Sequence, residues 1–223
     1  MKLISLPGFP SYEEVRILQH ELVEKRARGE VEDTVLFLEH RPVITRGRGL
    51  QFKPSSEQNQ PRQMPLGSLP EGIEFSESER GGDLTYHGPG QLVVYPIFKL
   101  DGEGFAPHHD VAGFLRKLER IFIVELESLG LAVRAVENAT GVWVGDKKVA
   151  SIGIAVRKWV TYHGIAINVV NDLSPFQLIS PCGFSSDVMT RLVDLLPGHK
   201  ELNGSGWRTW LEARLEERLI TAS

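Results

Sequence analysis

The sequence predicts a mixed α/β fold, of the α/β or α+β class, with a sheet that is mixed or largely antiparallel. Three observations support this prediction. Apolar residues recur at helical spacing in three segments, and several short apolar runs have the length and composition of strands. These helical and extended segments do not alternate strictly along the chain, as they would in a fully parallel sheet.

The helical pattern has clear start and stop residues. Ser11 and Glu14 match the S-x-x-E capping box, and Gly29 follows the last apolar position of that segment. The second helix is predicted over residues 110–129, with Asp110 as its N-cap and Gly130 as its stop. A C-terminal helix is indicated by Trp207, Trp210, Leu211, Leu215 and Leu219.

The strands are expected at residues 34–38, 92–98, 141–144, 148–156 and 162–170. Pro96 lacks a backbone N–H, which favours an edge strand or a bulge for the second of these. Residues 141–144 and 148–156 form a hairpin around Gly145 and Asp146. Residues 53–72 are rich in Pro, Ser, Gln and Gly and are expected to be a flexible loop. The chain has the same character on both sides of this loop, so residues 1–223 are expected to form one catalytic domain.

Composition excludes several classes of protein. Of 223 residues, 41% are apolar and 24% are charged, which excludes general disorder. A net charge of −4 argues against a nucleic-acid binder. No apolar run approaches the roughly 18–20 residues of a membrane helix, and the N-terminus is unlike a secretory signal. The one cysteine, Cys182, excludes an intrachain disulfide and indicates the reducing cytoplasm.

Three segments have residues suited to chemistry. Residues 80–95, RGGDLTYHGPGQLVVY, combine glycines with Arg80, His87 and Gln91, and match neither a Walker loop nor a dinucleotide fingerprint. Lys147 and Lys148 are adjacent in the hairpin, so strand alternation directs one of them to a cleft. Cys182 lies between Pro181 and Gly183 in a loop, where a reactive thiol and an inert thiol are equally compatible with the local sequence.

Together these segments resemble the lipoyl(octanoyl) transferase family. The family pattern RGG-x-x-T-aromatic-H-x-x-G-Q is matched from Arg80 to Gln91, and its lysine segment is matched by GVWVGDKKVASIG, with Lys148 in the place of the lysine. The pattern H-G-[IL]-A-x-N-V is matched from His163, and NDLSPFQLISPCG matches the nucleophile segment with Cys182 in the place of the cysteine. The resemblance runs from about Tyr12 to Leu192. The long loop and the C-terminal helix are outside its motifs.

This resemblance implies a fold like that of the biotin/lipoate protein ligases, with a larger mixed sheet flanked by helices and a smaller sheet. It implies transfer of an octanoyl group from octanoyl-acyl-carrier-protein to a lysine of lipoyl domains of 2-oxoacid dehydrogenases or of the glycine cleavage H protein, the first step of lipoate synthesis. No cofactor, metal, nucleic acid or membrane is implied, and a monomer is expected.

The resemblance also implies the site residues. Cys182 would be the acyl-thioester nucleophile, and Lys148 would lower its pKa and act in acid/base steps. The implied acyl-binding residues are Arg80, Gly81, Gly82, Asp83, Leu84, Thr85, Tyr86, His87, Ser151, Ile152, Gly153, Gly164, Ile165 and Ala166. Whether His87 orients the acyl carbonyl or the Cys–Lys pair stays open, as does its role relative to that of His163.

A nearby ammonium suits this chemistry because a free thiol has a pKa of about 8.5 and is mostly protonated near neutral pH. Lowering that pKa by about two units takes roughly 2.7 kcal/mol. Three alternatives remain at this point: an ATP-dependent lipoate-protein ligase, a non-catalytic acyl-carrier or lipoyl-domain binding module, and a Cys–His hydrolase.

Overall fold

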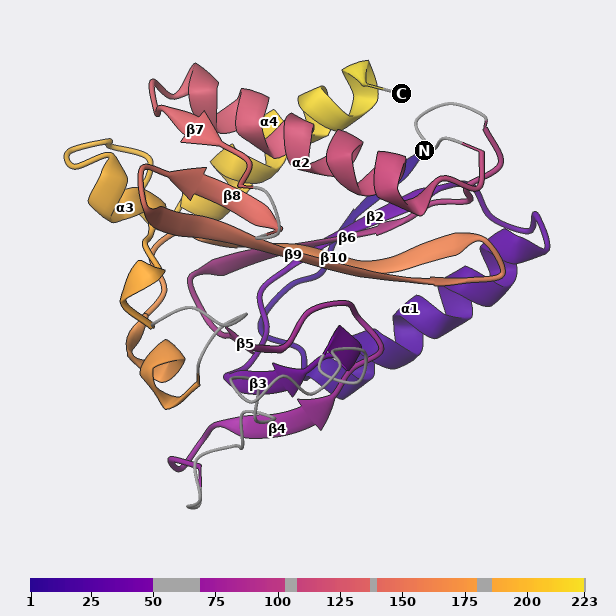
Figure 1. Ribbon diagram of the computed structural model, residues 1–223, viewed down its shortest axis with the longest axis horizontal. Coiled ribbons are helices and arrows are strands. Elements are labelled where there is room, and N and C mark those ends of the chain that lie inside the picture. The colour runs from indigo at the N-terminus through magenta and orange to yellow at the C-terminus, as the bar shows by residue number, and fades with distance from the viewer. Residues whose placement is uncertain (50–68, 103–107, 137–139, 180–185, 223) are drawn as a thin grey trace, which may run out of the picture.

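The computed structural model describes residues 1–49, 69–102, 108–136, 140–179 and 186–222. The predicted loop at 53–72 therefore lies outside the described residues, apart from its last four positions. Among the described residues the strands form two sheets (Figure 1). The larger sheet has the order β1 (Lys2–Ser5), β2 (Thr34–Leu38), β6 (Gln91–Ile97), β10 (Val160–Asn168), β9 (Lys147–Arg157), β8 (Gly141–Val144) and β7 (Val133–Arg134). The smaller sheet has the order β4 (Glu74–Glu77), β3 (Val43–Arg46) and β5 (Leu84–His87).

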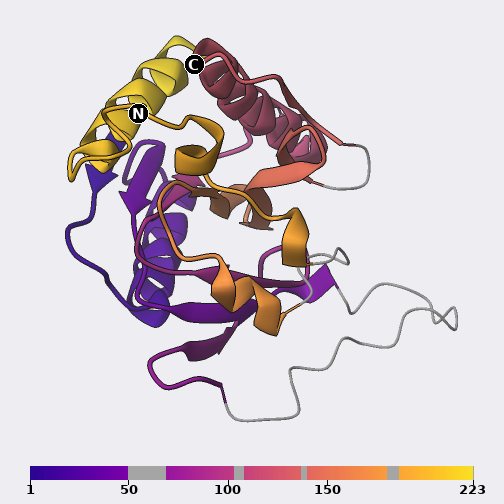
Figure 2. The same cartoon turned by 90° about the vertical axis from the view of Figure 1, so that its left-hand side faces the viewer.

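Helices cover both faces of the larger sheet. Helices α2 (Val111–Ser128) and α4 (Trp207–Thr221) pack on one face, and α1 (Tyr12–Ala27) packs on the other, on the same side as the smaller sheet (Figure 1). Figure 2 shows α2 and α4 side by side from the end of the molecule. Short helices within the described residues include the 3₁₀ turns η2 (Ser174–Leu178) and η4 (Ser186–Val188) and the α-helical turn α3 (Leu192–Leu195).

The mixed sheet predicted from the sequence is confirmed. Strands β1 and β2 are parallel, as are β3 and β4, and the other neighbouring pairs are antiparallel. Because both faces of the larger sheet are covered, every residue of β2 and β6 is buried. After a polar first residue, each strand is a continuous apolar run rather than an alternating one.

The C-terminal helix has a structural role that its sequence left open. Glu125 of α2 is 1% exposed and pairs with Arg214 and Arg218 of α4; its Oε2 lies 2.9 Å from Arg218 Nε. The apolar face of α4, which includes Leu211, Leu215 and Leu219, lies in the same core cluster as α2. Helix α4 therefore completes the cover over one face of the larger sheet.

The three predicted helices and the predicted hairpin are confirmed. Of the two alternatives predicted for the Pro96 strand, an edge position or a bulge, the edge position is wrong. Strand β6 is central, between β2 and β10. The β6–β10 ladder ends at Val94, two residues before Pro96, and the Pro96 carbonyl accepts a hydrogen bond from Thr161 Oγ1 at 2.7 Å. The interruption of the ladder allows a proline inside the sheet. The short strands β1, β3, β4, β5 and β7 were not predicted.

Every helix among the described residues is too short or too polar to cross a lipid bilayer.

The N-cap of α1 allows a direct stability test. Ser11 Oγ accepts a hydrogen bond from Glu14 N at 3.2 Å, and Ser11 N donates to Glu14 Oε2 at 2.7 Å. We expect Ser11→Ala to lower the free energy of unfolding by about 1 kcal/mol, or about 3 °C in Tm, because the Glu14 N–H loses its acceptor. Thermal denaturation measures this, and Ser11→Asp, which retains an acceptor, is the control expected to match the natural protein. An equal loss in both variants would contradict the capping role.

Candidate active site

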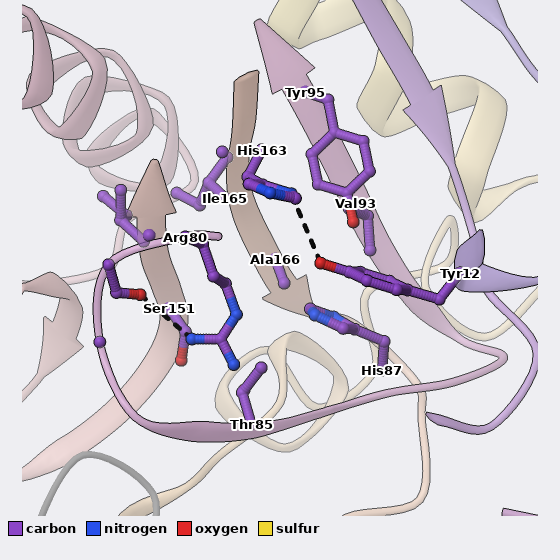
Figure 3. A pocket seen from close by; sticks show the side chains of 15 residues that line it. Tyr12, Arg80, Thr85, His87, Val93, Tyr95, Ser151, His163, Ile165 and Ala166 are labelled. Atoms are coloured by element: carbon purple, nitrogen blue, oxygen red, sulfur yellow. Dashed lines mark hydrogen bonds between the residues drawn. The ribbon is translucent and has the colours of Figure 1, made fainter. Parts of the chain in front are cut away.

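A pocket opens between the two sheets. Its walls come from α1, the segment before β5, and strands β5, β6, β9 and β10, and it holds about 460 Å³ of empty space including its mouth. The lining residues are Tyr12, Arg80, Gly81, Gly82, Thr85, His87, Val93, Tyr95, Ser151, Ile152, Gly153, His163, Gly164, Ile165 and Ala166. Figure 3 shows their side chains converging from several elements.

The structure brings together most of the acyl-binding residues expected from the sequence. Within 80–87, Asp83, Leu84 and Tyr86 do not line the pocket, whereas both later segments, 151–153 and 164–166, do. Leu84 and Tyr86 instead pack into the small cluster beneath η2. Strand alternation explains the difference, because Thr85 and His87 share one face of β5 and Leu84 and Tyr86 share the other.

Glycines let backbone approach backbone in the pocket wall. Gly81 N donates to Ile154 O at 2.9 Å, and a Cβ on Gly153 would lie 2.7 Å from Gly81 O. A Cβ on Gly164 would lie 2.2 Å from Val94 O. These contacts leave no room for side chains at the two positions, so the wall presents backbone to whatever occupies the pocket.

Arg80 fixes the loop that carries these glycines. It is 8% exposed, and its guanidinium donates to the Thr45 carbonyl at 2.8 Å and to Thr45 Oγ1 at 2.8 Å from Nη2. Its Nη1 also donates to Gly81 O at 3.1 Å. Arg80 thereby ties the glycine-rich loop to β3 and places a buried positive charge beside the pocket.

A group of stacked rings forms another wall. The Tyr12 ring lies between the imidazoles of His87 and His163, nearly parallel to both, with centroids 6.3 and 6.2 Å away (Figure 3). The Tyr12 hydroxyl donates to Ser78 Oγ at 2.6 Å and lies 3.5 Å from His163 Nδ1. The residues Tyr12, Val93 and Tyr95 were not expected here from the sequence, since their spacing signals only a helix and a strand.

Burial keeps the histidine rings that surround Tyr12 in their neutral form. It lowers the pKa of His40 to about 4 and lowers the pKa of His163, although Glu79 Oε2, 3.4 Å from His163 Nε2, opposes the latter shift. His40 Nδ1 lies 3.2 Å from Pro10 O, so it donates there, and its Nε2 accepts from the Tyr95 hydroxyl at 3.0 Å. The ring cluster therefore contributes hydrogen-bonding groups rather than positive charge near neutral pH.

A β-bulge directs Lys148 to the pocket face of the sheet. Val142 pairs with Ala150 and Trp143 pairs with Lys148, which leaves Val149 as an extra residue in β9. Val149 and Ala150 both lie in the core under α2 and α4. Side chains normally alternate between the two faces of a strand, but here two successive residues face the core. Lys148 and Ser151, which flank those two residues, therefore both face the opposite side of the sheet, where Ser151 lines the pocket.

The lysine is enclosed at this position. Lys148 is 2% exposed, and its Nζ lies 5.5 Å from the centre of the Trp143 ring. A Cβ on Gly141 would lie 2.5 Å from Lys148 Cε, so the absence of a side chain there leaves the room that the lysine occupies. Lys147 is different: its Nζ is exposed and donates to Asp187 O at 2.7 Å.

Cys182 lies outside the described residues, so the structure does not place its thiol. The chain on either side of residues 180–185 is described. Ile179 and Met189 pack in one cluster, and Met189 pairs with Lys148 in an isolated bridge, with Thr190 N donating to Lys148 O at 3.0 Å. The described chain that follows these residues therefore lies beside the strand that carries Lys148.

Within the described part of the chain, no group of three or more His, Cys, Asp or Glu residues is placed to hold a metal ion.

Comparison with known proteins agrees with this arrangement. A family model described as the lipoyl protein ligase A/B catalytic domain matches residues 11–204. The chain belongs to this family. A protein of Geobacter sulfurreducens named octanoyltransferase is 42% identical over 193 residues, which are 86% of this chain and 74% of that protein. Another of the same name from Caldicellulosiruptor saccharolyticus is 44% identical over 194 residues, 85% of this chain and 77% of that protein.

Solved structures of this lipoyl ligase family share the fold. A lipoate-protein ligase A bound with ATP superimposes with a TM-score of 0.62 and 16% identity, covering 99% of this chain and 83% of that chain. The bipartite lipoate protein ligase of Thermoplasma acidophilum gives a TM-score of 0.59 and 16% identity, covering 99% and 81%. The expected biotin/lipoate ligase-like architecture, with a seven-stranded and a three-stranded sheet among the described residues, is therefore confirmed.

Proposed function

We propose that this chain transfers an octanoyl group from octanoyl-acyl-carrier-protein to a lysine of a lipoyl domain or of the glycine cleavage H protein, through a thioester on Cys182. The observation that carries the proposal is the buried Lys148 on the pocket face of β9, in a chain more than 40% identical to proteins named octanoyltransferase. The reducing cytoplasm, which keeps a thiol free, is the compartment that suits this reaction.

The covalent route suits a reaction between two protein-borne groups. In the first step the Cys182 thiolate attacks the donor thioester, so a C–S bond forms as another breaks and the carrier leaves as its thiolate. In the second step the acceptor amine attacks, a C–N bond forms, and the Cys182 thiolate leaves. Each step needs only one protein partner bound at a time, and neither needs ATP, because a thioester is more reactive than the amide product.

Lys148 supplies the positive charge for both steps in this proposal. An ammonium near the thiol favours its ionised form and lowers its pKa. The pocket supplies the acyl site: the glycines at 81–82 and 153 leave room for a thioester to approach the backbone, and Val93, Ile165 and Ala166 offer apolar surface. Burying about seven methylenes at roughly 0.8 kcal/mol each is ample for chain-length selection.

The experiment that tests the proposal is intact-mass spectrometry after the protein is mixed with octanoyl-acyl-carrier-protein, followed by peptide mapping. We expect one octanoyl adduct on the Cys182 peptide, and its loss when a lipoyl domain is added, with the octanoyl group then on the acceptor lysine. Product from free octanoate and ATP alone would instead indicate a ligase. Release of free octanoate to water without an acceptor would indicate a hydrolase, and binding without an adduct would indicate a binding module.

Ala166 allows a test of the acyl site. It is 4% exposed, lines the pocket and pairs with Ser151 on the neighbouring strand. We expect Ala166→Leu to lower kcat/KM for octanoyl donors at least about tenfold, because the larger side chain occupies part of the pocket and overpacking costs about 1–3 kcal/mol. Butanoyl donors serve as the matched control, and their kcat/KM is expected to fall less. An equal loss for both chain lengths would place the acyl chain elsewhere.

A further inference from the structure

Gln91 lies behind the pocket, in a buried chain of hydrogen bonds. It is 1% exposed and begins β6, directly opposite Asn168 of β10. Its Nε2 donates to the backbone carbonyl of Tyr86 at 3.1 Å and to Asn168 Oδ1 at 2.9 Å. Its Oε1 lies 2.7 Å from His87 Nδ1. Each of the two polar atoms of the amide thus has a buried partner.

These partners assign the orientation of the amide and then the tautomer of His87. A backbone carbonyl only accepts hydrogen bonds, so the atom of Gln91 that faces Tyr86 O must be the NH₂ group. The atom that faces His87 is therefore the carbonyl oxygen, which also only accepts. His87 Nδ1 must then carry the hydrogen, and in the neutral ring Nε2 is left as an acceptor with a free lone pair.

The surroundings keep the His87 ring in its neutral form. Burial lowers the pKa of His87 well below its usual value, and the positive charge of Arg80 acts in the same direction, opposed by the hydrogen bond to Gln91. The Tyr12 ring stacks on one side of the imidazole, and the His40 ring lies 5.8 Å away. His87 also lines the pocket, so a proton acceptor is present beside the proposed acyl site.

We propose that Gln91 is a positioning residue that locks His87 in the Nδ1–H tautomer, and that His87 Nε2 accepts the proton which the attacking amine loses during acyl transfer. This inference rests on the proposed function. It excludes one of the two roles that the sequence left open for His87, orientation of the acyl carbonyl, because a neutral Nε2 that carries no hydrogen cannot donate to the carbonyl oxygen. The carbonyl oxygen is left to donors such as backbone N–H groups.

The step balances without any added reactant. The neutral acceptor amine attacks the thioester carbon and forms the C–N bond, and its nitrogen becomes positively charged. That nitrogen gives one proton to His87 Nε2, which forms the imidazolium. The C–S bond then breaks, the thiolate leaves with the electron pair, and the imidazolium returns its proton to the sulfur, so His87 is neutral again at the end.

Nitrogen NMR of the natural protein tests the lock directly. With ¹⁵N-labelled histidine, His87 is identified by the signals that disappear in His87→Asn. Across neutral pH we expect Nδ1 to have the ¹⁵N chemical shift of a protonated ring nitrogen, and Nε2 to have that of an unprotonated ring nitrogen. A hydrogen on Nε2 at pH 7 would overturn the proposal, whatever the activity of the protein.

Gln91→Met tests the catalytic consequence, because methionine has similar length but offers no acceptor of comparable strength to Nδ1–H. We expect a mixture of His87 tautomers by NMR and at least a tenfold slower discharge of the octanoyl group from the enzyme to a lipoyl domain. We expect the preceding acylation by the donor to slow by much less. In a His87→Asn background, Gln91→Met should cause no further loss in discharge. A purely structural role predicts instead that both steps slow equally, and that outcome overturns the proposal.

The proposed function and this inference fail in different ways. If the natural protein forms no octanoyl adduct with octanoyl-acyl-carrier-protein, the proposed function fails, while the NMR shifts still report the tautomer of His87. If the adduct forms and is transferred but His87 carries its hydrogen on Nε2, the function stands and the inference fails.

Discussion

Lys148→Met is expected to slow octanoyl-enzyme formation by about two orders of magnitude while the protein stays folded. The substituted side chain retains most of the apolar stem of a residue that is 2% exposed and lies against Gly141 and Trp143. It removes the charge that we propose lowers the pKa of Cys182 by about two units, equivalent to a factor of about 100. Methionine is therefore a better test than alanine, which would also leave a cavity.

Two measurements check this prediction. The rate of octanoyl adduct formation is followed by mass spectrometry, and the pKa of the thiol is read from the pH dependence of its alkylation by iodoacetamide. We expect the midpoint of the alkylation profile to rise in Lys148→Met, because the ionised thiol loses a neighbouring positive charge. Stability is checked by thermal denaturation.

Lys147→Met is the matched control. It makes the same chemical change one residue earlier, at a half-buried side chain whose Nζ donates to Asp187 O. We expect the acylation rate and the thiol pKa to stay close to those of the natural protein. Normal acylation in Lys148→Met, or an equal loss in both variants, would remove Lys148 from its proposed role.

Gly141→Ala is expected to lower the acylation rate about a hundredfold through the position of Lys148. A methyl group at Gly141 would lie 2.5 Å from Lys148 Cε and 2.4 Å from Ala150 O, and Gly141 has φ of 140°, a conformation that other residues rarely adopt. The lysine must move, the strand must shift, or both. We expect a loss of stability of about 1–3 kcal/mol in addition to the loss of rate.

Gly145→Ala is the control that distinguishes backbone strain in the hairpin from displacement of Lys148. Gly145 lies in the turn of the same hairpin with φ of 60°, and a methyl group there would meet nothing within 4 Å. We expect about 1 kcal/mol of destabilisation and an unchanged acylation rate. The comparison uses unfolding midpoints and single-turnover rates of both variants, and a large loss of rate in Gly145→Ala would attribute the effect in Gly141→Ala to general damage to the hairpin.

Local sequence patterns predicted the elements that local interactions stabilise. The capping box of Ser11 and Glu14 forms within one helical turn, and the Gly145–Asp146 turn joins adjacent strands, so both are visible in a few consecutive residues. Pro96 was misplaced because the position of a strand in a sheet depends on partners far along the chain. Strands β3, β4 and β5 also escaped prediction, because each has only four residues and pairs with a strand that does not follow it in a tight hairpin.

The acyl pocket was predicted only in part. The segments that carry glycine motifs were found through their resemblance to a family, and they lie together in the structure. Tyr12 joins the pocket from the first position of α1, which packs on this face of the larger sheet. Its spacing in the sequence indicates only a buried helix position. Gln91 was found as part of a motif, but its hydrogen-bond partners, and the contact of Glu79 with His163, are known only from the structure.

The amino-acid sequence alone was sufficient for the mixed fold class, the three helices, the hairpin and the family resemblance, because these follow from short-range spacing and from motifs of fixed length. The orientation of Lys148 and the tautomer of His87 were decided only by tertiary structure. The first depends on one extra residue in the pairing of β8 with β9, and the second on a carbonyl and an asparagine that hold the Gln91 amide. Both depend on contacts between residues that are distant along the chain or paired across strands, and the spacing of residues in the sequence does not determine the geometry of such contacts.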